Sequence, residues 1–154
     1  MSQWYRADVE AGHVGSQQFT LDEHNSLLME QYQKDNFRVL DLDAKKKTCF
    51  IFFSSNGLYF PNDVETFQQT VVEKDRYEWE NIAQSSLIRR FAGRLIFVRD
   101  LFKAWYVTGI NARVNSIDKL IAMLKDLTEG YEVITCGGSA GGYMSTLGGA
   151  GAPR

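Results

Sequence analysis

The 154-residue sequence has few of the side chains that disulfide frameworks and metal sites require. Its two cysteines, Cys49 and Cys136, are too few for a disulfide framework, and each lies inside an apolar run. We therefore expect buried free thiols in a reducing compartment. Its two histidines, His13 and His24, belong to no group with the spacing of metal ligands. The sequence thus predicts neither a bound metal nor a cofactor.

A surplus of positive charge and a long apolar run are also missing. Seventeen Lys and Arg against nineteen Asp and Glu give a net charge of −2, which disfavours nucleic acid as a partner. No apolar run approaches the ~20 residues that a membrane span needs. Asp8, Glu10 and His13 interrupt the N-terminus, so no secretory signal is visible. We expect a cytoplasmic protein that binds neither nucleic acid nor membrane.

Four segments have the pattern of β-strands. Residues 37–42 alternate apolar and polar side chains, whereas residues 48–53 form a continuous apolar run that suits a strand buried on both faces. The short polar turn between these two segments predicts an antiparallel hairpin. Residues 94–99 and 131–136 are the other two candidate strands.

Helical patterns alternate with these strands. Residues 21–33 and 79–90 have helical character, and residues 116–127 form the clearest helix, because apolar side chains recur there every three or four residues. Ser116 before this helix and Gly130 after it are start and stop signals. The alternation predicts an α/β fold, a three-layer αβα sandwich with a mostly parallel sheet and helices on both faces.

The length suits one domain, and the hydrophobic content of 44% suits a buried core. We expect a single α/β domain over residues 1–154, with a peripheral N-terminal segment at 1–35 and a core at 37–147.

The last predicted strand runs directly into a glycine cluster. Residues 137–141 read G-G-S-A-G, which fits the G-x-S-x-G pattern of a nucleophile elbow. A strand that reverses into a helix brings backbone close to backbone, so the flanking positions favour glycine. Ser139 at the apex would then be strained, with its hydroxyl pushed outward. The backbone N–H of Ala140 would lie at a helix N-terminus, where it can stabilise an oxyanion.

This strand–GGSAGGY–helix stretch resembles the α/β-hydrolase superfamily. Together with the motifs at residues 97–100, 105–106 and 109, it is similar to α/β-hydrolase-like proteins of bacterial surface-polysaccharide gene clusters, over about residues 46–147. The resemblance implies an esterase or acyltransferase acting on a small-molecule or glycan ester. It implies Ser139 as nucleophile and the Ala140 N–H as one oxyanion donor. The second donor would come from the loop of Ser55, Asn56 and Gly57.

The sequence departs from the family after the serine. The family supplies its acid and histidine after the nucleophile, but none of the fifteen residues after Ser139 is Asp, Glu or His. Gly148, Gly149 and Gly151 would each cost about 1 kcal/mol in a helix. We therefore expect a domain that is incomplete after the elbow and inactive as this chain. Its uncovered sheet edge would invite self-association.

Each of these assignments has an alternative. The cluster around Ser139 could be a turn without chemistry or a phosphate-binding loop, although the spacing of known phosphate-binding motifs is absent. Asn56 and Gly57 could form an ordinary turn. Asp100, at a strand end, could be a helix cap or a catalytic acid. Trp105 and Tyr106 could belong to the core or to a sugar-binding platform, with the core favoured. The whole chain could be a non-catalytic binding module of a polysaccharide pathway, or a fragment without independent function.

Overall fold

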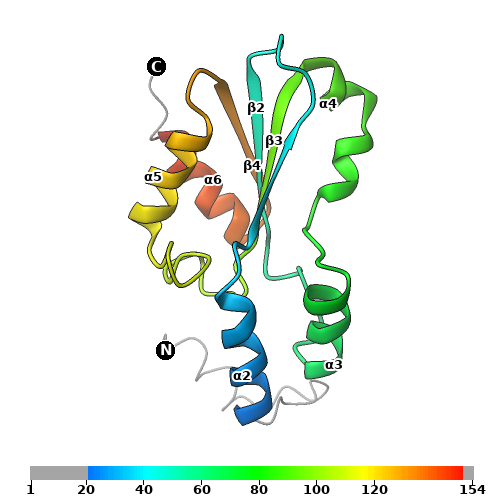
Figure 1. Ribbon diagram of the computed structural model, residues 1–154, viewed down its shortest axis with the longest axis vertical. Coiled ribbons are helices and arrows are strands. Elements are labelled where there is room, and N and C mark those ends of the chain that lie inside the picture. Colours follow the sequence, from blue (N-terminus) through cyan, green and yellow to red (C-terminus); the bar gives the residue numbers. More distant parts are fainter. Residues whose placement is uncertain (1–20, 151–154) are drawn as a thin grey trace.

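The computed structural model describes residues 21–150, with side-chain surroundings for residues 26–149. His13 and Gly151 lie outside the described residues, as does the side chain of His24. The fold is α/β, with one four-stranded mixed sheet and helices packed around it (Figure 1). The strands are β1 (Phe37–Asp41), β2 (Thr48–Phe53), β3 (Ala92–Val98) and β4 (Glu132–Gly137). The helices are α2 (Leu21–Tyr32), α3 (Val64–Phe67), α4 (Ser86–Phe91), α5 (Ile117–Leu127) and α6 (Ala140–Ala150), with a π-helical turn η1 (Gln68–Glu73) and a 3-10 turn η2 (Glu80–Gln84).

The sheet order is β1-β3-β2-β4, so the expected hairpin of the first two strands is wrong. β1 pairs antiparallel with β3, whereas β2 lies between β3 and β4 and runs parallel to both. The turn after β1 passes across the start of β3 at Gly93, whose carbonyl accepts hydrogen bonds from the N–H groups of Leu42 and Asp43. A Cβ at Gly93 would lie 2.1 Å from the Lys46 carbonyl oxygen, so only glycine permits this crossing.

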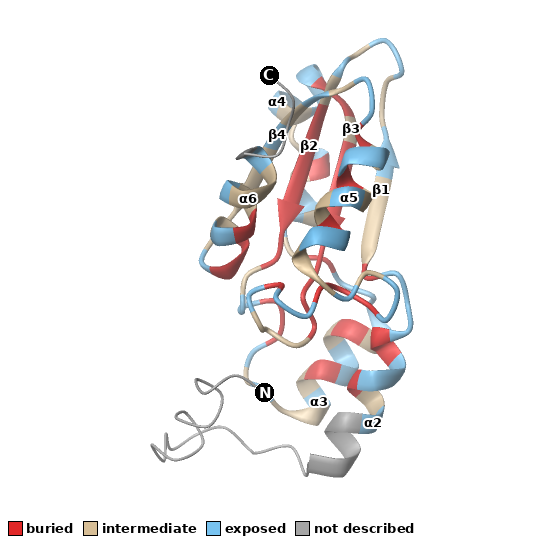
Figure 2. Ribbon diagram, turned by 90° about the vertical axis from the view of Figure 1, so that its left-hand side faces the viewer, coloured by how far each residue is buried: buried red, intermediate tan, exposed pale blue. Residues whose placement is uncertain are grey.

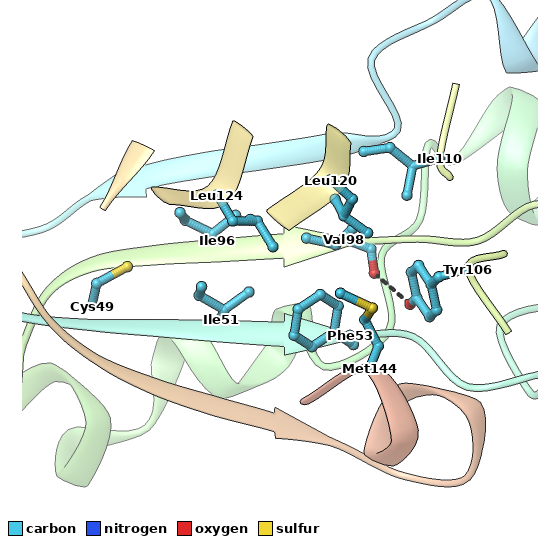
Figure 3. Close-up of a cluster of buried hydrophobic side chains, with 10 residues drawn as sticks. All are labelled: Cys49, Ile51, Phe53, Ile96, Val98, Tyr106, Ile110, Leu120, Leu124 and Met144. Atoms are coloured by element: carbon cyan, nitrogen blue, oxygen red, sulfur yellow. Dashed lines mark hydrogen bonds between the residues drawn. The ribbon is translucent and has the colours of Figure 1, made fainter. Parts of the chain in front are cut away.

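Both faces of the central strands are buried, as the continuous apolar run of residues 48–53 predicts. One face packs under α5 and α6, and the opposite face packs under η2 and α4 (Figure 1). On the second face, the Phe52 ring stacks on Phe50 and on Phe97, at centroid distances of 6.3 and 5.4 Å. The cluster on the first face is drawn in Figure 3 and consists of Cys49, Ile51, Phe53, Ile96, Val98, Tyr106, Ile110, Leu120, Leu124 and Met144.

A third apolar cluster lies beyond the carboxyl end of β2, where α2 and α3 are grouped (Figure 2). Its buried members include Leu28 of α2, Phe67 of α3 and Leu58 and Leu101 of the loops that follow β2 and β3. The Tyr32 hydroxyl also donates to the Thr108 carbonyl over 2.5 Å. This cluster fixes the two loops at the carboxyl ends of the strands, where the candidate site lies.

The helix starts and stops follow the sequence signals in part. Ser116 caps α5, and its Oγ accepts a hydrogen bond from the Lys119 N–H over 3.3 Å. Gly130 takes a φ of +78°, which glycine adopts without strain. α6 continues through Gly148 and Gly149, although glycine is unfavourable inside a helix. A Cβ at Gly148 would lie 3.7 Å from Phe53 and Thr135, so this part of the helix is closely seated on the sheet.

β4 forms one edge of the sheet, and Ile134 on it is 43% exposed. Self-association through this edge stays a prediction. Within residues 21–150, no helix is both long and apolar enough to cross a membrane.

The two thiols give a first testable prediction. Both cysteines are free; Cys49 is buried and Cys136 is half-buried. Burial raises the pKa of Cys49 from 9.0 to about 12, which lowers its thiolate fraction at pH 8 about 1000-fold. We expect Cys49 to remain unmodified by a chromogenic disulfide reagent at pH 8 until the protein unfolds. Rapid reaction of both thiols in the native protein would contradict the buried position of Cys49.

Candidate active site

Ser139 occupies a strained turn between β4 and α6. Its φ is +51°, in the left-handed region that residues other than glycine avoid. The turn is closed by two hydrogen bonds, from the Gly141 N–H to the Gly138 carbonyl over 2.9 Å and from the Tyr143 N–H to the Ser139 carbonyl over 3.0 Å. Ser139 itself is exposed. A strained, exposed serine at a strand–helix junction is the geometry of a nucleophile elbow.

The two glycines of the G-x-S-x-G pattern are required by close backbone packing. A Cβ at Gly137 would lie 2.3 Å from the backbone carbonyl group of Gly141. A Cβ at Gly141 would lie 2.4 Å from the Phe53 carbonyl oxygen at the end of β2. At Gly138, by contrast, the nearest atom to a Cβ would be Cζ2 of Trp79 at 3.9 Å. The expected crowding of the flanking positions is therefore confirmed for Gly137 and Gly141.

The backbone N–H of Ala140 is available at the start of α6. Ala140 is the first residue of the helix, so its N–H has no carbonyl partner inside the helix. The partial positive charge of the helix N-terminus favours an anion at this position. Ala140 is itself buried. The predicted donor and Ser139 are thus neighbours at the same turn.

The loop after β2 lies beside the elbow, because a Cβ at Gly141 would also lie 2.9 Å from the Ser54 carbonyl oxygen. Asn56 and Gly57 are exposed in this loop, and the Gly57 N–H donates to Ser55 Oγ over 2.9 Å. The Ser55 N–H and Oγ donate to the Glu78 carboxylate over 2.6 and 3.0 Å. In this loop, Ser55 is therefore the residue that binds an anionic oxygen.

Glu78 is a site residue that the sequence did not indicate. It stands before Trp79, whose indole ring lies beside Gly138, and it is half-buried against the loop after β2. No motif surrounds Glu78, and it lies in a connecting segment rather than at a strand end. Only the fold brings this segment to the elbow.

Asp100 holds the loop after β3. Its carboxylate accepts hydrogen bonds from the N–H groups of Phe102, Ala104 and Tyr106 over 3.1, 2.8 and 2.9 Å. Burial raises the pKa of Asp100 to about 6, although these N–H groups favour its charged form. No helix begins in the described stretch between β3 and α5, so Asp100 is not the helix cap that its position at a strand end predicts; both of its oxygens instead bind backbone groups of the loop.

Tyr106 and Trp105 have different environments. Tyr106 is fully buried, and its hydroxyl donates to the Ser54 carbonyl over 2.9 Å, so its assignment to the core is confirmed. Trp105 is 47% exposed, so its assignment to the core is wrong. Its ring packs edge to face with Tyr143 of α6, with a centroid distance of 5.9 Å and an interplanar angle of 77°.

Lys103 is a half-buried amine in the same loop. Its Nζ donates to the Tyr59 carbonyl over 2.5 Å and to Asn62 Oδ1. The Nζ also lies 3.7 Å from the centre of the Tyr59 ring. Burial lowers the pKa of Lys103 to about 8, while the negative charges of Asp100 and Glu78 oppose that shift. The side chain therefore joins the loops after β2 and β3.

Fold and site together define an α/β protein with a strained serine at a strand–helix turn. No protein-family model, no curated protein and no solved structure matches this chain. Among the residues whose side chains are described, no group of three or more His, Cys, Asp or Glu is placed to hold a metal ion.

Proposed function

We propose that this chain is a serine-hydrolase-like domain, an esterase or acyltransferase, with Ser139 as its nucleophile. The observation that carries the proposal is the left-handed Ser139 between Gly137 and Gly141, whose backbones touch each other and the end of β2. In a glycine-rich turn without chemistry, glycine would take this left-handed position without strain, so a serine there indicates a function.

In the proposed reaction, Ser139 Oγ attacks the carbonyl carbon of an ester. The carbonyl oxygen becomes an oxyanion, which accepts hydrogen bonds from the Ala140 N–H and from the loop of residues 55–57. A base from solution takes the Ser139 hydroxyl proton and returns it to the departing alkoxide, so that an alcohol leaves and an acyl-enzyme remains, from which water or a second alcohol takes the acyl group. Ser55 needs to exchange its carboxylate partner Glu78 for the oxyanion if its N–H is the donor.

The sheet supports this assignment. β2 and β4 are hydrogen-bonded neighbours that run parallel. The loop after β2 and the elbow after β4 therefore lie at the same end of the sheet. An α/β-hydrolase elbow requires a second N–H donor to the oxyanion, from a neighbouring loop at that end of the sheet. We propose that the helices on both faces make this sheet part of a three-layer sandwich of α/β-hydrolase type.

Past Ser139, the 154-residue sequence offers no residue that could serve as its base. No Asp, Glu or His follows Ser139, and an unassisted serine hydroxyl is a poor nucleophile. We therefore expect little turnover from this chain alone. Added imidazole supplies the missing base from solution and provides a direct test.

The test is labelling of the purified chain with a fluorophosphonate, with and without imidazole. We expect imidazole to accelerate labelling at least about tenfold, a small part of the ~10²–10⁴ that a positioned base contributes. Ser139→Ala should abolish the accelerated labelling. Ser145→Ala, which changes a serine inside α6 whose Oγ donates to the Gly142 carbonyl, should leave it intact. Labelling that is equal in the chain and in Ser139→Ala would refute the proposal for this chain.

The second candidate is a non-catalytic module of α/β-hydrolase type that binds a glycan or a protein of a polysaccharide pathway. The absence of an acid or histidine after Ser139 favours it. Labelling that appears only in a longer chain with a downstream Asp and His would instead favour an incomplete enzyme.

A further inference from the structure

Three large aromatic side chains are half-exposed near Ser139. Trp79, Trp105 and Tyr143 are 43%, 47% and 44% exposed, although residues of this size usually bury most of their surface. They come from three separate parts of the chain: the segment before η2, the loop after β3, and α6. Any approach of these side chains to one another therefore depends on the fold.

Each of the three rings can be placed relative to the elbow. Trp79 lies beside Gly138, the residue before Ser139. Tyr143 stands one helical turn after Ser139, to which it is joined by the hydrogen bond from its N–H. Side chains on a helix lean toward its N-terminus, so the Tyr143 ring leans toward the elbow. Trp105 packs edge to face against that ring.

Two of these residues have a backbone conformation that bulky residues avoid. Trp79 has a φ of +71° and Trp105 has a φ of +56°. Such strain persists only where the surrounding structure enforces it, and it clusters at ligand sites. A half-exposed indole stabilises the fold little through burial. Stability alone therefore does not explain a tryptophan at either position.

We propose that Trp79, Trp105 and Tyr143 form a subsite for a ring-sized apolar group of the ester on which Ser139 acts. This inference rests on the proposed function and specifies its substrate class as aryl or arylacyl esters. The perpendicular rings of Trp105 and Tyr143 present flat walls at an angle, which suits one ring better than an extended acyl chain. The carboxylate of Glu78 beside Trp79 disfavours a negatively charged group.

The first experiment compares two fluorophosphonates that differ only in a phenyl or a methyl substituent, both with imidazole present. We expect the phenyl probe to label Ser139 about ten- to hundredfold faster, as burial of an aromatic group from water predicts. Trp79→Ala and Trp105→Ala should each bring this ratio close to one. Trp105→Phe should restore most of the preference.

The matched control is Leu87→Ala on α4. Leu87 is 64% exposed and lies in a helix at the opposite face of the sheet from α6, so its removal should leave the probe ratio unchanged. A phenyl preference that survives both tryptophan substitutions, or no preference in the parent chain, would overturn the subsite.

A second experiment does not depend on Ser139 reactivity. In a Trp4→Phe, Ser139→Ala chain, Trp79 and Trp105 are the two remaining tryptophans and report directly on the subsite. We expect phenyl acetate to change their fluorescence saturably and ethyl acetate to leave it unchanged. Saturable binding without any labelling of Ser139 would refute the proposed function and keep the subsite. Labelling without phenyl preference and without saturable binding would refute the subsite and keep the proposed function.

Discussion

Gly141→Ala is expected to destabilise the protein by about 3 kcal/mol or more, the upper part of the range for an overpacked site. The new Cβ would lie 2.4 Å from the Phe53 carbonyl oxygen and 2.9 Å from that of Ser54. Both are backbone atoms at the end of β2, which is buried on both faces, so neither can move aside like a flexible side chain. Chemical denaturation of the variant and of the parent chain measures the difference in free energy of unfolding.

Gly138→Ala is the matched control, three residues earlier in the same turn. A Cβ there would make an ordinary contact with Trp79 at 3.9 Å, and Gly138 does not have a left-handed φ. We expect a change within about 1 kcal/mol, since alanine also restricts the unfolded chain. Equal losses from the two substitutions would show that the turn tolerates a Cβ at both positions, which contradicts the packing that makes Ser139 an elbow residue.

The elbow could be predicted because its physical cause is local. Gly137 and Gly141 crowd each other across one tight turn, so the sequence spacing alone carries the information. The strands at residues 48–53 and 131–136 were predicted for the same reason, since apolar runs and turn residues are read within a few positions. These parts of the fold depend little on distant residues.

The remainder of the site depends on long-range packing. Glu78 binds Ser55, which lies 23 residues earlier in the sequence, and no pattern in either segment predicts the contact. The hairpin of the first two strands was wrong because the position of β1 depends on β3 and on the close passage at Gly93. Trp105 was assigned to the core because aromatic residues usually lie there, but its exposure follows from a left-handed loop that no periodicity reveals.

Arg99→Met is expected to destabilise the protein by roughly 3 kcal/mol, because it leaves the buried Asn36 Oδ1 without this donor and removes an ion pair and a hydrogen bond made by a buried guanidinium. The guanidinium is almost fully buried and pairs with Asp75 over 2.8 Å. It also donates to Asn36 Oδ1 over 3.1 Å and to the Arg76 carbonyl over 3.0 Å. Methionine fills a similar volume without hydrogen bonds, so the measured loss in chemical denaturation reports on the polar contacts.

Arg38→Met is the matched control, since Arg38 pairs with the same Asp75 over 3.0 Å but is 41% exposed. Exposed ion pairs contribute little, so we expect a loss below about 1 kcal/mol, which salt should diminish further. Both guanidinium groups lie over the Tyr77 ring, at 4.5 Å for Arg38 and 4.4 Å for Arg99. Tyr77 immediately precedes Glu78 and Trp79, so the buried arginine also anchors the segment that reaches the elbow. Equal losses in the two variants, both abolished by salt, would contradict this role for Arg99.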